Sequence, residues 1–133
     1  MSRPAPSRVG LLRVLLLIEA AAGVALTIAL SLVAAGISEL SPEDIGADAG
    51  VRFVASAVFI GAILAAIAAR GVRRRRRWSW TLAALLQLAL GIGTVIAVLA
   101  ADWHPSYFAG FVFAAVVMLV LSMAPVRRAL GQD

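Results

Sequence analysis

Glu19 is the residue of this chain whose position most favours chemistry. It is the only carboxylate inside any of the long apolar runs, in the stretch LLLIEAAAG. A charge at the centre of a membrane-spanning helix costs at least ~2.5–3.5 kcal/mol, so this group needs a proton, a partner or water. Gln87 lies at a similar depth in another apolar run, and its amide can bond to either protonation state of the acid. We therefore expect Glu19 and Gln87 to form an intramembrane polar pair.

Two interpretations of this pair stay open. It could be a structural hydrogen bond between helices, which contributes ~0.6–2 kcal/mol in membranes. It could also be a proton- or cation-coupled site, because ionisable groups inside membranes commonly mark transport pathways.

Other kinds of site have little support in the sequence. There is no cysteine and only one histidine, His104, whose spacing from Asp102 matches no known metal motif. No Ser/His/Asp set and no glycine-rich phosphate loop is present. We predict no enzyme, no cofactor and no metal site.

Four apolar runs must position these residues, at roughly 14–35, 51–69, 80–100 and 107–124, in a chain that is 62% hydrophobic. Each is near the ~20 residues that cross a bilayer as a helix, and only helices satisfy their own backbone groups there. The sequence predicts an all-α, single-domain four-helix transmembrane bundle over residues 1–133. Ser41-Pro42-Glu43-Asp44 predicts an outer helix starting near residue 42, which either runs into the second apolar helix or breaks at Gly46 or Gly50. Pro125 should end or kink the fourth helix.

Arginine sets the expected orientation. All twelve basic residues are arginine, and only Arg52 falls on the side opposite the rest if the chain crosses four times. Basic residues collect on the cytoplasmic side of membrane proteins, which places both termini and the 70–77 loop inside. The arginine-only, alanine-rich composition is typical of a GC-rich bacterial genome. We expect a multi-pass protein of the bacterial plasma membrane.

A run of five arginines lies in the central loop: Arg73, Arg74, Arg75, Arg76 and Arg77. Near anionic headgroups each arginine contributes ~1 kcal/mol of membrane attraction. The run is interpreted either as a contact for anionic lipid headgroups or as a topology determinant only. Nucleic-acid binding is disfavoured, because the loop is tied to the bilayer at both ends.

Small residues predict close helix packing. The second run carries Ala57, Gly61 and Ala65 at four-residue spacing, and the fourth carries Gly110 and Ala114; Gly23 and Gly91 lie four residues after Glu19 and Gln87. Small residues at this spacing let helix backbones approach closely. They could pack the bundle internally or form a homo-oligomer face. The stretches 18–23 and 86–91 align loosely, which suggests a parallel repeat of two helical hairpins.

The stretches LLLIEAAAG, RRWSWTLAALLQLALG and PVRRALG resemble those of uncharacterised four-helix membrane proteins of actinobacterial type, which implies fold and orientation only. A more distant likeness, in architecture, is to the small multidrug resistance exporters. In that family a glutamate of helix 1 binds protons and cationic substrate, which would give Glu19 that role. The chain lacks that family's lysine after helix 1 and its aromatic residues in helix 3.

Two functional hypotheses follow. The first is a non-catalytic accessory or scaffold subunit that acts through helix packing and lipid contact, with another membrane protein or a second copy as partner. The alternative is a small proton-coupled transporter or channel that uses Glu19.

Overall fold

The computed structural model describes residues 8–40, 45–100 and 105–132, and these ranges are helical apart from short turns. Five helices follow in order: α1 (Arg8–Leu40), α2 (Ile45–Arg73), α3 (Arg77–Ala100), α4 (Pro105–Ser122) and the short α5 (Ala124–Ala129). The described part of the chain is therefore all-α, as the sequence predicts.

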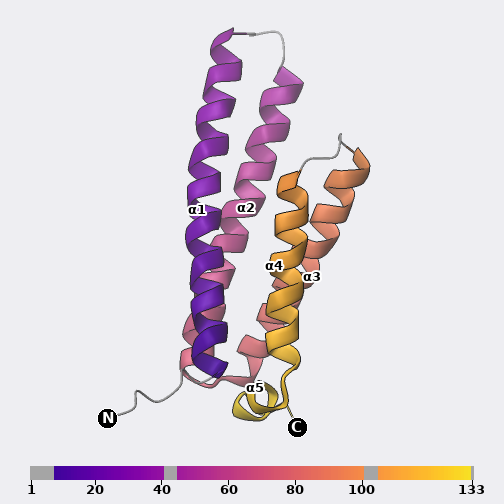
Figure 1. Ribbon diagram of the computed structural model, residues 1–133. Coiled ribbons are helices and arrows are strands. Elements are labelled where there is room, and N and C mark those ends of the chain that lie inside the picture. Colours follow the sequence, from indigo (N-terminus) through magenta and orange to yellow (C-terminus); the bar gives the residue numbers. More distant parts are fainter. Residues whose placement is uncertain (1–7, 41–44, 101–104, 133) are drawn as a thin grey trace, which may run out of the picture.

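The four long helices form two antiparallel hairpins, α1–α2 and α3–α4 (Figure 1). The beginning of α1, the α2–α3 turn and α5 lie at one end of the molecule, here called the arginine-rich end. At 1.5 Å per residue, α1 and α2 are about 50 and 44 Å long, whereas α3 and α4 are about 36 and 27 Å. The first hairpin therefore projects beyond the second at the opposite end (Figure 1).

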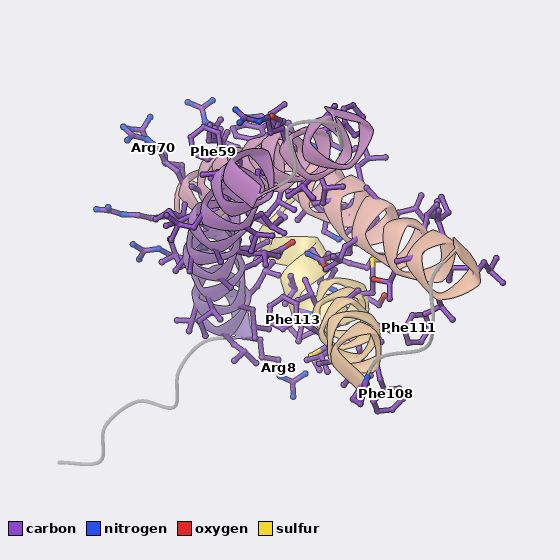
Figure 2. The ribbon with its side chains drawn as sticks, turned by 90° about the horizontal axis from the view of Figure 1, so that it is seen from above. Arg8, Phe59, Arg70, Phe108, Phe111 and Phe113 are labelled. Atoms are coloured by element: carbon purple, nitrogen blue, oxygen red, sulfur yellow. The ribbon has the colours of Figure 1, made fainter. Side chains whose placement is uncertain are left out.

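Three helices are long and apolar enough to cross a membrane, within Arg8–Gly36, Ala49–Arg73 and Arg77–Leu99, and a shorter apolar helix covers Phe108–Ser122. Their large apolar side chains face outward, as Figure 2 shows for Phe59, Phe108 and Phe111. So large an exposed apolar surface is stable in contact with lipid and not with water. The length and the apolar surface of these helices therefore indicate a membrane protein.

The helices extend past the apolar runs that predicted them. Helix α1 starts at Arg8 rather than near residue 14, and α2 starts at Ile45 rather than near 51. Hydropathy marks the lipid-facing part of a helix, while good helix formers such as arginine and alanine continue the backbone beyond it. The expected capping residues 41–44 lie outside the described residues. From Ile45 onward α2 runs without a break through Gly46 and Gly50, so no separate outer helix is seen there.

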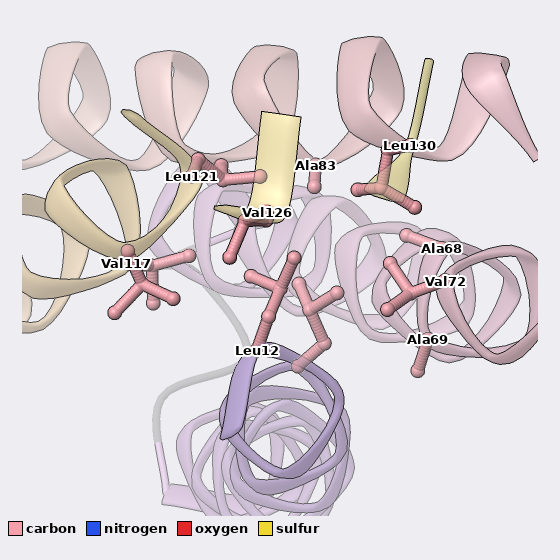
Figure 3. Close-up of a cluster of buried hydrophobic side chains, with 11 residues drawn as sticks. Leu12, Ala68, Ala69, Val72, Ala83, Val117, Leu121, Val126 and Leu130 are labelled. Atoms are coloured by element: carbon pink, nitrogen blue, oxygen red, sulfur yellow. The ribbon is translucent and has the colours of Figure 1, made fainter. Parts of the chain in front are cut away.

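The buried core lies near the arginine-rich end (Figure 3). It joins all five helices: Leu12 and Leu16 of α1, Ala68, Ala69 and Val72 of α2, Ala83 of α3, Val117, Val120 and Leu121 of α4, Val126 of α5, and Leu130 directly after α5. Helix α5 lies across the end of the bundle, and the side chains of Val126 and Leu130 insert between the long helices. It acts as a lid on the core.

The break between α4 and α5 follows from Pro125. Met123 takes an extended conformation (φ −64°, ψ 130°), and Pro125 lies in the first turn of α5. Because proline has no N–H, it cannot donate to the carbonyl of Leu121 four residues earlier. Trp80 of α3 fills this role, since its Nε1 donates to Leu121 O at 3.0 Å. The tryptophan thus joins α3 to the end of α4.

Candidate functional site

The polar pair expected in the membrane is present. Gln87 Nε2 donates a hydrogen bond to Glu19 Oε2 at 2.7 Å, across the bundle from α3 to α1. Gln87 is only 1% exposed, and Glu19 is partly buried. The residues lie about 17 and 15 Å along their helices from Arg8 and Arg77. The structure therefore brings the two predicted residues together, within the apolar part of the bundle and nearer to the arginine-rich end than to the opposite end.

The second polar atom of the Gln87 amide has no hydrogen-bond partner in the part of the chain that the structure describes. Gln87 Oε1 is buried and has no hydrogen-bond partner among the described residues. A carboxylate only accepts hydrogen bonds, whereas a protonated carboxyl group also carries one O–H donor. A protonated Glu19 could therefore satisfy this oxygen, which an ionised Glu19 cannot do.

Five hydroxyl groups of the long helices bond to the backbone of their own helix. The donor and acceptor pairs are Thr27 to Gly23 O, Ser31 to Thr27 O, Ser56 to Arg52 O, Thr94 to Leu90 O and Ser122 to Met118 O, all between 2.8 and 2.9 Å. Each bond joins a residue to the carbonyl four positions before it. These polar groups are thus satisfied locally, as side chains in an apolar surrounding must be.

An open groove runs between α3 and α4 beside the pair. It has a volume of about 390 Å³ and includes Gln87, Gly91 and Ala114 in its lining, together with apolar side chains such as Ile92 and Phe111. Its surface is almost wholly apolar. The groove is suited to an acyl chain or an apolar side chain rather than to a polar solute.

Gly23 is the small residue with the tightest surroundings of those predicted for packing. A Cβ at this position would lie 2.8 Å from Ala62 Cβ, so α1 and α2 meet here without a side chain between them. The Thr27 hydroxyl also lies 3.5 Å from Ala55 O on α2. Gly23 is therefore a packing residue of the first hairpin.

The predicted stripe on α2 packs only in part. Ala65 is buried, but Ala57 is exposed, and a Cβ at Gly61 would meet no atom within 4 Å. The buried seam instead follows alternating spacings of three and four residues, as in left-handed coiled packing. It includes Ala55, Ala62, Ala65, Ala69 and Val72. Residues spaced strictly by four drift around a helix of 3.6 residues per turn and so leave the buried seam. Ala57 and Gly61 therefore lie beside the seam and do not pack within the chain.

On the second hairpin the outcome is similar. Ala114 is buried, and a Cβ at Gly110 would lie 3.5 Å from Thr94 Oγ1, which is ordinary contact. A Cβ at Gly91 would meet nothing within 4 Å, because this glycine borders the open groove. The expectation of close packing at Gly91 is therefore not met within the chain.

Gly71 is a packing residue that the sequence did not single out. A Cβ there would lie 2.7 Å from Ser79 Cβ and 2.8 Å from the Trp78 ring, at the corner between α2 and α3. Gly71 lies two residues before the arginine run, and Trp78 and Ser79 directly follow the run. This order is the one signal that could have indicated a tight turn.

The arginine run forms this turn. Arg76 N donates to Gly71 O at 3.0 Å and Arg75 N to Val72 O at 3.1 Å, which is the bond pattern of a Schellman motif. In that motif the residue with left-handed backbone angles is usually glycine. Here it is Arg75, with φ +50°, the only non-glycine residue of the described chain with a positive φ. All five arginines of the run are exposed.

The end of the chain docks on the same turn. Gln132 Nε2 donates to Arg77 O at 3.3 Å, and a Cβ at Gly131 would lie 3.0 Å from Arg77 Cγ. Arg127 Nη2 donates to Gln132 O at 3.4 Å. The exposed Arg127 and Arg128 of α5 are thereby held beside the α2–α3 turn. We call these two residues and the run 73–77 the arginine cap.

Within the described residues, no group of three or more histidine, cysteine, aspartate or glutamate side chains could hold a metal ion. Asp102 and His104 lie outside the described residues. A comparison of the chain with models of protein families, with curated proteins and with solved structures found no match.

Proposed function

We propose that this protein is a non-catalytic accessory or scaffold subunit of the bacterial plasma membrane. It crosses the membrane four times with both termini in the cytoplasm, and it acts through helix packing and lipid contact. Its partner is another membrane protein or a second copy, and it needs no cofactor or nucleic acid.

The observation that carries this proposal is how the polar groups in the helices are used. Glu19 bonds to Gln87, and the hydroxyl groups of Thr27, Ser31, Ser56, Thr94 and Ser122 bond to backbone carbonyls of their own helices. The outward surface is apolar along each long helix. Side chains spent on internal bonds support a structural role, whereas a solute pathway needs polar groups that are free to exchange partners.

A proton-coupled transporter or channel centred on Glu19 is the second candidate. The unpartnered Gln87 Oε1 favours it, because this oxygen gives a proton on Glu19 a place to bond. The pair would then change its hydrogen bonding as the proton comes and goes, which is what proton coupling requires.

Two measurements on the same preparation separate the candidates. The tagged full chain is purified from its native membrane in mild detergent, and part is reconstituted into liposomes that hold a pH-sensitive dye. We expect a stoichiometric membrane-protein partner or a second copy in the purified sample. We also expect proton flux equal to that of empty liposomes, for the wild type and for Glu19→Gln alike. A solitary chain whose proton flux disappears in Glu19→Gln would contradict the scaffold proposal.

A further inference from the structure

Arg75 occupies a backbone position that suits glycine better than arginine. Its φ of +50° lies in the left-handed region, where a Cβ crowds the following carbonyl. Glycine avoids this contact and is the usual residue at this point of a Schellman motif. A residue kept against its backbone preference is a reason to look for a role of its side chain.

The neighbours of Arg75 add to its charge rather than balance it. Among the side chains that the structure describes, the only carboxylate is that of Glu19, which lies along α1 inside the bundle and bonds to Gln87. No ion pair joins a described acid to the arginine cap. Exposed guanidinium groups of successive residues repel one another unless an anion lies between them.

Helix α5 brings two more guanidinium groups to this end of the molecule and is anchored there by its own contacts. Val126 and Leu130 are fully buried in the core, and Gln132 bonds to Arg77 O. This anchoring keeps α5, with the exposed Arg127 and Arg128, at the end of the bundle that also holds the α2–α3 turn (Figure 1). The basic surface therefore comes from two separate parts of the chain that the fold joins.

We propose that the arginine cap is a binding site for the phosphate groups of anionic phospholipids, and that α5 is the element that completes it. The proposal rests on the proposed membrane function and deepens its lipid contact. Guanidinium groups bind phosphate oxygens through paired N–H donors. Trp78 and Trp80, at the start of α3, lie where tryptophan side chains commonly meet lipid headgroups. The cap lies at the same end of the helix and so at headgroup depth.

The test measures lipid binding and thermal stability on the same variants of the full chain in detergent. Short-chain phosphatidylglycerol and phosphatidylcholine are titrated and bound lipid is counted by native mass spectrometry. One arginine near an anionic headgroup contributes about 1 kcal/mol, which is about fivefold in binding. Arg75→Gly should therefore weaken phosphatidylglycerol binding about fivefold, and the double variant Arg127→Gln, Arg128→Gln about 25-fold. Phosphatidylcholine binding should not change.

Stability gives the second readout. Arg75→Gly should raise Tm by about 4 °C, because it relieves the left-handed strain of the turn. A loss of lipid binding together with a gain in stability cannot come from misfolding. Arg52→Gln is the matched control, since it removes one exposed arginine near the other end of α2. It should alter phosphatidylglycerol binding less than twofold.

Three results would overturn the proposal. One is a loss of phosphatidylglycerol binding in Arg75→Gly no larger than in Arg52→Gln. Another is full binding in the Arg127→Gln, Arg128→Gln variant, which would remove α5 from the site. The third is displacement of the lipid by millimolar inorganic phosphate, which would make free phosphate the ligand. Each leaves the partner and proton-flux measurements untouched, so failure of this site is distinguishable from failure of the proposed function.

Discussion

At the scale of single residues, the Glu19–Gln87 bond decides how the middle of the bundle is held. It is a charge-capable hydrogen bond between helices that otherwise meet little, since α1 packs mainly on α2 and α3 mainly on α4. The bond therefore joins the two hairpins within their apolar part. Loss of either residue would leave the other polar side chain among apolar neighbours without its hydrogen-bond partner.

Removing one partner of the pair should destabilise the protein more than replacing one partner by another group that can form hydrogen bonds. Gln87→Leu leaves Glu19 without its partner and should lower the free energy of unfolding by about 1–3 kcal/mol. Glu19→Gln keeps an acceptor for Gln87 Nε2 and adds a donor for Gln87 Oε1, so its effect should stay within about 1 kcal/mol. Reversible unfolding in mixed micelles measures both.

The single variant Glu19→Leu and the double variant Glu19→Leu, Gln87→Leu complete the cycle of leucine substitutions. Replacing both partners by apolar groups should recover most of the loss seen in Gln87→Leu alone. If the two single substitutions simply add, the bond between Glu19 and Gln87 contributes nothing and the assignment of a structural pair is wrong.

Gly23 offers a second test at this scale. Gly23→Ala places a methyl group 2.8 Å from Ala62 Cβ and should force α1 and α2 apart, at a cost of about 1–3 kcal/mol. Gly61→Ala is the control, because its Cβ meets nothing within 4 Å and alanine favours the helix by about 1 kcal/mol. Unfolding should thus show opposite signs for the two variants. Equal effects would mean that the close approach at Gly23 is not a packing constraint.

At the scale of elements, the end of α4 shows how one proline organises three helices. Pro125 ends α4, frees the Leu121 carbonyl for Trp80 and starts α5. The short α5 then places Val126 and Leu130 in the core. The lid over the core and the arginine cap both depend on this break.

Removing the tryptophan donor should loosen this junction. Trp80→Phe keeps an aromatic ring but leaves Leu121 O without its bond, and should cost about 1–2 kcal/mol of unfolding free energy. Trp78→Phe, two residues earlier and half exposed, should cost less than half of that. Hydrogen exchange of the α5 amides gives an independent readout, since they should exchange faster in Trp80→Phe only. Unchanged exchange in both variants would contradict the role of this bond.

Most of the helices, and the polar pair between them, could be predicted from the sequence. Apolar runs bounded by arginine indicate the four long helices. The single carboxylate and the amide within these runs indicate the Glu19–Gln87 pair, because buried polar groups require hydrogen-bond partners. Helix α5 was missed, since six residues carry no period that pattern analysis can detect. Gly61 and Gly91 were assigned to close packing on spacing alone, whereas the hairpins pack along a seam of alternating three- and four-residue steps.

At the scale of the whole molecule, packing and charge are concentrated at the same end. The buried core and the arginine cap lie together, while the first hairpin projects beyond the second at the other end (Figure 1). Phe53, which is 76% exposed, belongs to the upper part of this hairpin. An apolar hairpin that extends past its own bundle is suited to contact with lipid or with a partner, in agreement with the proposed accessory role.

The central claim is that the chain crosses the membrane four times with the arginine-rich end inside, and cysteine labelling tests it most directly. The chain has no cysteine of its own, so single cysteines at Ser7, Ser38, Ala101 and Asp133 can be probed one at a time with an impermeant maleimide in intact cells. The account predicts labelling at 38 and 101, and labelling at 7 and 133 only after permeabilisation. Because α4 is the shortest of the long helices, labelling of position 133 in intact cells with position 7 protected would show three crossings and contradict the account.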